Sequence, residues 1–196
     1  MEFLLAIAAS TAVVFVAELG DKTQLVAMSL ATRYRAATVL LGITIATLVV
    51  HGLSVVIAEV VGLALPTDWI ALAAGVAFVG FGVWTLLGDE LTDKDEERAA
   101  SRRIGSGLIT VAVVFFTAEL GDKTMLATIT VGTHYDWLPV WIGSTVGMVV
   151  ADALAIALAA VLGKKLPERA VQIGAALLFF LAGGAMVVEG VRAVAG

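Results

Sequence analysis

The sequence predicts an all-α integral membrane protein with six transmembrane helices, arranged as two inverted three-helix repeats. Three observations lead to this prediction: long apolar runs, an internal repeat, and an uneven distribution of basic residues among the loops. The chain has 196 residues, of which 60% are hydrophobic and 15% are charged. Soluble domains are about 45–50% apolar and about 25% charged. The composition therefore excludes an ordinary soluble domain.

Six apolar segments are long enough to be membrane spans, for which about 18 apolar residues suffice. They are Phe3–Ala31, Ala36–Leu65, Trp69–Leu87, Ile104–Val131, Trp137–Leu162 and Ala170–Val188. None has the two-residue alternation of a membrane-spanning strand. The N-terminus has no basic region, so we expect it to begin the first span and not to be a cleaved signal peptide.

The chain repeats itself at an offset of 101 residues. Residues 17–23 and 118–124 have the same sequence, AELGDKT, and further identical residues lie on both sides of it. Each half holds three spans, an odd number, so the second copy must enter the membrane from the opposite side, as in many secondary transporters. We therefore expect a first repeat (1–88), a charged linker (89–103) and a second repeat (104–196). A duplicated scaffold without a transport role is the alternative.

The loop charges give an independent prediction of orientation. The loops on one side of the predicted bundle carry nine Lys or Arg residues, whereas the other side carries only Arg192. Cytoplasmic loops are enriched in Lys and Arg, so we expect the linker in the cytoplasm and both termini outside. The Ala/Val/Gly-rich composition and the short loops favour the plasma (inner) membrane of a bacterium.

The repeated heptapeptide puts charges at membrane depth. As one helix, the first apolar segment would be about 44 Å long, whereas the hydrocarbon core is about 30 Å thick, so Glu18 falls near mid-membrane. A charge there costs about 2.5–3.5 kcal/mol and is retained where it is paired, hydrated or bound. The glycine in each copy weakens a helix. A break there would free backbone carbonyls beside the carboxylates, as in the discontinuous spans that form ion sites.

We expect both copies to contribute to one metal site. Its ligands are Glu18, Asp21, Glu119 and Asp122. With the two lysines of the copies, these groups sum to a charge of −2. All-oxygen ligands suit calcium, manganese or magnesium, and the absence of cysteine excludes thiolate sites. Because crowded carboxylates cannot all be ionised, an empty site would recruit protons. Alternatively, Glu and Lys pair within each helix and only stabilise the bundle.

Other polar side chains are candidates for supporting this site or for coupling it to protons. They are Lys22, Thr23, Gln24, Lys123, Thr124, Asp152 and His51. The amide oxygen of Gln24 could reach the ion, and its counterpart Met125 offers a soft thioether or simply packs. His51 and Asp152 occupy equivalent repeat positions near mid-span. Asp152 could carry protons or bind the ion, and His51 could relay protons or be a hydrogen-bonded interior residue.

The paired Glu-x-Gly-Asp-(Lys/Arg)-(Thr/Ser) pattern resembles that of the small calcium/manganese–proton exchanger family, part of the lysine-exporter superfamily. Both copies, ELGDKT, match it without departure, and the likeness covers nearly the whole chain. The resemblance implies cation/proton antiport, with Glu18, Asp21, Glu119 and Asp122 as the cation site. Bacterial members of this type export manganese, and the motif leaves manganese or calcium open.

The expected function is therefore secondary active export of manganese and/or calcium in exchange for protons. Export of another cationic solute, such as a basic amino acid, is the alternative, and a passive channel would lack proton coupling. No Ser/His or Cys/His arrangement suggests an enzyme. We expect the divalent cation, protons and the lipid bilayer as partners, with no cofactor beside the transported ion. The net charge of −5 and the lack of a basic cluster argue against nucleic acid. The oligomeric state, a homodimer included, stays open.

Overall fold

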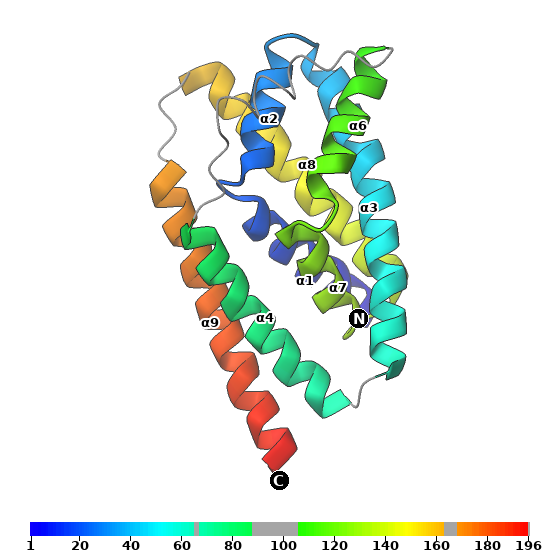
Figure 1. The fold of residues 1–196 in the computed structure, drawn as a ribbon, viewed down its shortest axis with the longest axis vertical. Helices are drawn as coiled ribbons and strands as arrows, with labels where there is room; N and C mark the ends of the chain where they lie inside the picture. Colours follow the sequence, from blue (N-terminus) through cyan, green and yellow to red (C-terminus); the bar gives the residue numbers. More distant parts are fainter. Residues whose placement is uncertain (65–66, 88–105, 163–167, 196) are drawn as a thin grey trace.

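The computed structural model describes residues 1–64, 67–87, 106–162 and 168–195, which form helices joined by short turns (Figure 1). The helices are α1 (Glu2–Glu18), α2 (Lys22–Ala31), α3 (Ala36–Ala64), α4 (Thr67–Leu87), α6 (Gly107–Glu119), α7 (Lys123–Gly132), α8 (Trp137–Leu162) and α9 (Glu168–Ala195). No strand occurs in these four ranges, so the all-α prediction is confirmed for them. The predicted linker 89–103 lies outside the described residues.

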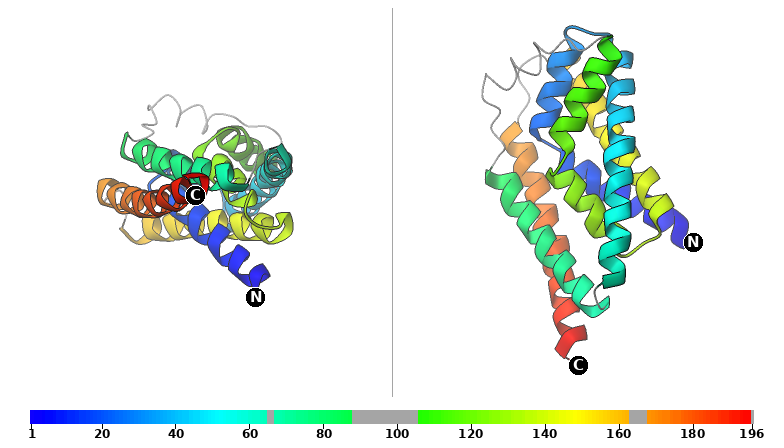
Figure 2. Two further views of the ribbon diagram at one scale, coloured as in Figure 1. Left: turned by 90° about the horizontal axis from the view of Figure 1, so that it is seen from below. Right: turned by 45° about the vertical axis from the view of Figure 1, so that its right-hand side comes forward.

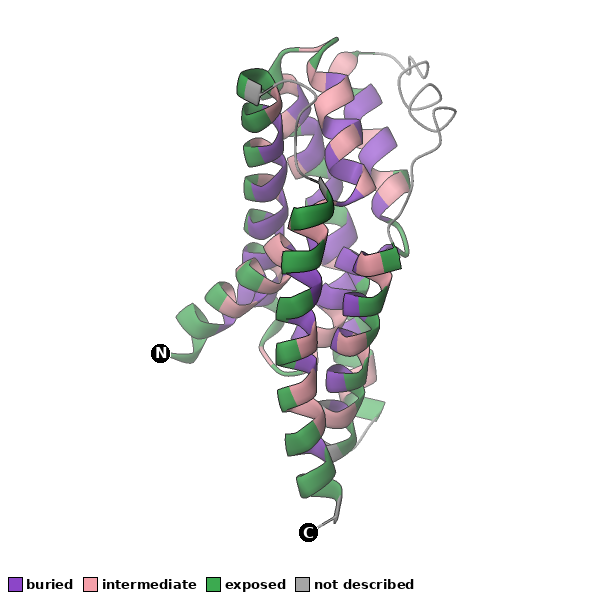
Figure 3. Cartoon of the chain, turned by 90° about the vertical axis from the view of Figure 1, so that its left-hand side faces the viewer, coloured by how far each residue is buried: buried purple, intermediate pink, exposed green. Residues whose placement is uncertain are grey.

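The described helices are those of a membrane protein. By length and composition, α3, Trp137–Val161 of α8 and Arg169–Val194 of α9 can each cross a bilayer, and α1 with α2 passes as a fourth, bent span. Residues Leu72–Leu87 and Gly107–Glu119 form shorter apolar helices. Many large apolar side chains are exposed along the outer faces of the helices (Figure 3). The count of six spans stays a prediction.

The two halves have the same order of helices. Helices α2 and α7, α3 and α8, and α4 and α9 begin 101 residues apart. In Figure 1, α1 and α2 lead upward and α6 and α7 lead downward, whereas α3 descends and α8 rises. The contacts between helices follow the same repeat. Helix α1 packs on α8, and their counterparts in the other half, α6 and α3, pack on each other. Helices α4 and α9 pack on each other at one edge of the molecule (Figures 1 and 2).

Glycines let the helices of different halves approach closely. A Cβ atom on Gly143 of α8 would lie 2.5 Å from the carbonyl oxygen of Ile7, and one on Gly147 would lie 2.5 Å from that of Thr11. The equivalent Gly42 of α3 faces Val111 of α6, whose Cβ would be 2.7 Å from the added atom. These small residues recur at four-residue spacing, which is typical of close packing between membrane helices.

Two apolar clusters lie on opposite sides of the helix breaks. The first, the α2-side cluster, contains Val26, Ala27, Leu30, Val39, Ile43, Ala46, Val111, Val114, Phe115 and Ile156. The second, the α7-side cluster, contains Ala17, Val55, Phe78, Phe81, Ala127, Val131, Val140 and Phe179. The ring centroids of its three phenylalanines lie 5.8 to 6.0 Å apart. The carboxylates at the helix breaks are thus buried between two apolar layers.

Candidate cation site

Each copy of the heptapeptide forms a sharp break between two helices. We call residues 18–22 the first elbow and residues 119–123 the second elbow. The glycines at their centres, Gly20 and Gly121, have φ angles of 70° and 80°. L-residues with a side chain rarely adopt this conformation, whereas glycine does so without steric cost. The first elbow bends α1 against α2 by 80°. The glycine of each motif therefore sets the break, as the sequence predicts.

The elbows combine helix ends of opposite polarity. Helices α1 and α6 end at Glu18 and Glu119, and α2 and α7 begin directly after Asp21 and Asp122. A helix N-terminus stabilises a nearby anion, and a helix C-terminus favours a cation. Each elbow therefore holds its aspartate at a positive helix end and offers carbonyl oxygens from a negative one.

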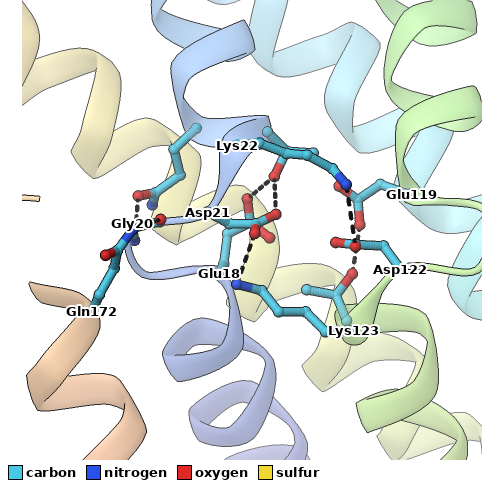
Figure 4. Close-up of polar contacts among 11 residues, drawn as sticks. Glu18, Gly20, Asp21, Lys22, Glu119, Asp122, Lys123 and Gln172 are labelled. Atoms are coloured by element: carbon cyan, nitrogen blue, oxygen red, sulfur yellow. Dashed lines mark hydrogen bonds and ion pairs between the residues drawn. The ribbon is translucent and has the colours of Figure 1, made fainter. Parts of the chain in front are cut away.

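The lysines pair across the two elbows (Figure 4). The Nζ atom of Lys123 lies 2.7 Å from Oδ1 of Asp21, and Nζ of Lys22 lies 3.7 Å from Oδ1 of Asp122. These two contacts are reciprocal, because each joins the Asp of one copy to the Lys of the other. These two ion pairs therefore link the two copies of the motif.

The two glutamates are fully buried and each contacts a threonine. The Thr23 hydroxyl lies within hydrogen-bonding distance of Glu18 Oε1 and of Asp21 Oδ2, the latter at 2.9 Å. The Thr124 hydroxyl donates to Glu119 Oε2 at 2.5 Å. The other glutamate oxygens, Glu18 Oε2 and Glu119 Oε1, are buried without a hydrogen-bond partner in the described part of the chain. A buried polar atom without a partner is costly, so both oxygens are available to a proton or a cation.

Asp152 of α8 joins the same cluster of carboxylates. It is fully buried and interacts electrostatically with Glu18, Asp21 and Glu119. Neither of its carboxylate oxygens has a hydrogen-bond partner within the described ranges. With Asp152, five carboxylates and two lysines sum to −3 when all are ionised, one negative charge more than the motifs alone supply. Its repeat counterpart His51 is also fully buried, and both ring nitrogens lack a partner among the described residues.

The residues that follow the motifs bind the elbow backbone. Gln24 Oε1 accepts a hydrogen bond from the Gly20 N–H at 3.0 Å, and its Nε2 donates to the carbonyl oxygen of Ala151 at 3.3 Å. Met125 Sδ accepts from the Gly121 N–H at 3.2 Å. The amide oxygen and the thioether that the sequence offers as ligands therefore hold the two elbows in this structure.

Gln172 of α9 is a contact that the sequence analysis missed. Its Nε2 donates to the carbonyl oxygen of Gly20 at 3.3 Å (Figure 4). The repeat gives no signal for it, because the residue 101 positions earlier is Ala71. A polar glutamine near the start of an apolar stretch is the one feature of the sequence that points to this contact.

In this structure, the ammonium groups of the two motif lysines lie among the motif carboxylates. Within the described ranges, no three His, Asp or Glu side chains are arranged so that they could hold a metal ion together. Asp21 and Asp122 are instead neutralised by Lys123 and Lys22.

Comparison with known proteins identifies the family. The model of the divalent cation/proton antiporter GDT1 matches residues 6–93 and 107–193. The chain is 34% identical to a "Putative manganese exporter" of Vibrio cholerae serotype O1, over 89% of this chain and 86% of that protein. A GDT1-like protein of Synechocystis sp. is 30% identical over 91% of this chain and 94% of its own length.

A plant relative is longer than this chain. Protein PAM71, chloroplastic, of Arabidopsis thaliana is 33% identical over 90% of this chain, which spans 55% of that protein. No solved structure matches the chain significantly. Each of the two stretches that match the family model contains one elbow, and the family comprises transporters and not enzymes. The chain therefore belongs to the GDT1 family of divalent cation/proton antiporters.

Proposed function

We propose that the protein exports manganese and/or calcium in exchange for protons, through one site that both elbows build. The observation that carries this proposal is the reciprocal pairing of Asp21 with Lys123 and of Asp122 with Lys22. This pairing draws the two copies of the motif together in the interior. Membership of the antiporter family supports the exchange of a divalent cation for protons.

The proposed ligands are the motif carboxylates, with Asp152 beside them. A cation enters when the two lysines leave the aspartates, so that Asp21 and Asp122 turn toward it together with the unpartnered oxygens of Glu18 and Glu119. The threonines hold the glutamates in place. Oxygen ligands suit manganese and calcium, and the name of the Vibrio relative favours manganese.

Protons and the cation compete for the same carboxylates. Carboxylates crowded in an apolar interior cannot all stay ionised when the cation has left, so departure of the cation is coupled to proton uptake. Arrival of the next cation expels these protons. The supporting roles fall to Lys22 and Lys123 as counterions of the empty site, and to Asp152 and His51 as candidates for proton movement.

For the membrane arrangement we propose six spans in two inverted three-helix repeats, residues 1–88 and 104–196, joined by a cytoplasmic linker. The opposite directions of equivalent helices support this arrangement (Figure 1). The loop charges support termini on the outer side of a bacterial plasma membrane. The two apolar clusters then close the site toward both faces, as in an occluded state of a transporter.

Proton movement in everted vesicles under an imposed pH gradient tests the proposal. Manganese, calcium, magnesium and free lysine are added in turn to wild type, to Glu119→Gln and to the control Glu189→Gln, which changes an exposed residue of α9. We expect manganese or calcium to collapse the gradient in wild type and in the control, but not in Glu119→Gln. A response to lysine alone would identify a basic amino-acid exporter, and no response to any solute would contradict coupled exchange.

A further inference from the structure

We infer that Asp152 makes the cation site one-sided: its carboxylate binds the divalent cation on the α2 side of the elbows, and the equivalent position on the α7 side is His51. This inference rests on the proposed function and adds a direction to it. It assigns the difference between the two faces of the transporter to one pair of repeat-equivalent residues.

The crossing of α3 and α8 separates these two residues. The Thr47 hydroxyl of α3 donates to Met148 Sδ of α8 at 3.3 Å, and these residues lie 101 positions apart. The helices therefore cross at equivalent points of the repeat. His51 and Asp152 each lie four residues later, about 6 Å further along their helices. Because α3 and α8 run in opposite directions (Figure 1), the two residues leave the crossing toward opposite ends.

The apolar clusters give the same placement independently. Ile156, one turn after Asp152, belongs to the α2-side cluster, whereas Val55, one turn after His51, belongs to the α7-side cluster. The bond from Gln24 Nε2 to the carbonyl oxygen of Ala151 also ties α8 to α2 directly beside Asp152. Asp152 thus lies between the elbows and the α2-side cluster.

The chemistry of the two positions differs for a hard cation. Asp152 has two buried oxygens without hydrogen-bond partners within the described ranges, and its carboxylate interacts electrostatically with Glu18 and Asp21. Carboxylate oxygens are preferred ligands of manganese and calcium, whereas imidazole suits zinc, copper, iron and nickel better. A cation on the α2 side meets one more carboxylate than a cation on the α7 side.

The α2 side is the cytoplasmic side in the proposed topology. Helix α2 leads into the loop with Arg33 and Arg35, one of the basic loops. An additional carboxylate on that side raises the affinity for a cation that arrives from the cytoplasm. On the opposite side its absence favours release, and this asymmetry suits a protein that works as an exporter.

The test measures the manganese dependence of proton exchange separately from each face, in reconstituted vesicles of known orientation. We expect Asp152→Asn to raise the KM for manganese on the cytoplasmic face about tenfold and to leave the outer KM unchanged. The control Glu18→Gln changes a group of the central site and abolishes exchange from both faces. An equal rise of both KM values in Asp152→Asn, or no rise, overturns the inference.

His51→Asp gives a second, independent result. It adds a carboxylate on the α7 side, so we expect the outer KM to fall toward the cytoplasmic value; an unchanged outer KM also overturns the inference. If Asp152→Asn does not fold, or transports too slowly for its KM to be measured, the outer KM of His51→Asp tests the inference by itself. If wild type moves no protons with any divalent cation, the proposed function fails and the inference falls with it. If wild type exchanges and only the sidedness is missing, the inference alone fails.

Discussion

The two elbows have the same seven-residue sequence and the same glycine conformation, but they have different surroundings. At the first elbow, side chains bind both backbone groups of Gly20, since Gln24 accepts from its N–H and Gln172 donates to its carbonyl oxygen. At the second elbow, the N–H of Gly121 is bound by the sulfur of Met125. A thioether is a weak acceptor, so we expect the second elbow to open more easily.

The lysines differ in the same way. The Lys123 side chain is 3% exposed and lies 2.7 Å from its aspartate, whereas that of Lys22 is 28% exposed and lies 3.7 Å from its partner. Identical sequences therefore have unequal interactions, and the difference comes from residues outside the motif. The repeated residues therefore give both elbows the same carboxylates and lysines. The residues around each elbow determine how firmly its backbone is bound and how deeply its lysine is buried.

The largest expected effect on transport comes from replacing the glutamates, and it should be the same for both halves. Glu18→Gln and Glu119→Gln should each reduce manganese/proton exchange about 100-fold or more, because each removes a charged oxygen ligand of the cation, and even the loss of an outer partner of a metal ligand costs about 10–100-fold. Vesicle assays of both variants beside Glu189→Gln measure this loss. If either variant kept half of the wild-type rate, the two elbows would act as separate sites.

Replacing the lysines should reveal the inequality between the halves. Lys123→Gln leaves Asp21 buried without its counterion and should lower the free energy of unfolding by about 3–5 kcal/mol. Lys22→Gln removes a longer pair whose lysine is 28% exposed and therefore partly solvated, so it should cost less than Lys123→Gln. Thermal unfolding in detergent compares them, and equal losses would show that the difference in burial has no consequence.

Replacing the elbow glycines should affect both halves moderately. Gly20→Ala and Gly121→Ala each force a side chain into the left-handed region, which costs about 1–2 kcal/mol per residue. The control is Gly184→Ala in α9, which has no positive φ and no atom within 4 Å of the added Cβ. Melting temperatures of the three variants test this, and a neutral Gly121→Ala would mean that the second elbow does not need its turn.

The smallest expected effect comes from exchanging the residues that hold the elbow amides. Gln24→Met should speed hydrogen exchange at the Gly20 amide, and Met125→Gln should slow it at the Gly121 amide. Each change corresponds to about 0.5–1.5 kcal/mol, the net value of one hydrogen bond. Hydrogen exchange followed by mass spectrometry over both elbows measures it. If neither rate changed, the contacts of Gln24 and Met125 would not determine how easily the elbows open.

Much of the arrangement could be predicted from the sequence because it follows from local rules. The apolar runs give helices close to the predicted bounds, and a glycine beside mid-membrane charges indicates the breaks at Gly20 and Gly121. The repeat also singles out His51 and Asp152. The sequence could not predict which lysine meets which aspartate, because that depends on how closely the two elbows approach in three dimensions.

Other contacts could not be predicted because they depend on single residues in distant helices. Gln172 reaches Gly20 from α9, and no pattern in either segment relates the two positions. From the sequence, the amide oxygen of Gln24 could be expected to reach the ion. In the structure this oxygen accepts a hydrogen bond from the Gly20 N–H instead. The elbow amide is left free by the helix break, and it is the nearer partner for this side chain.

The central claim is that two copies of one motif build a single cation site. Equilibrium binding of manganese to the purified protein, followed by electron paramagnetic resonance of the free ion, tests it most directly. The account predicts one manganese ion bound per chain in wild type, and none at the same concentration in either Glu18→Gln or Glu119→Gln. Two ions per wild-type chain, with one retained in each variant, would contradict it.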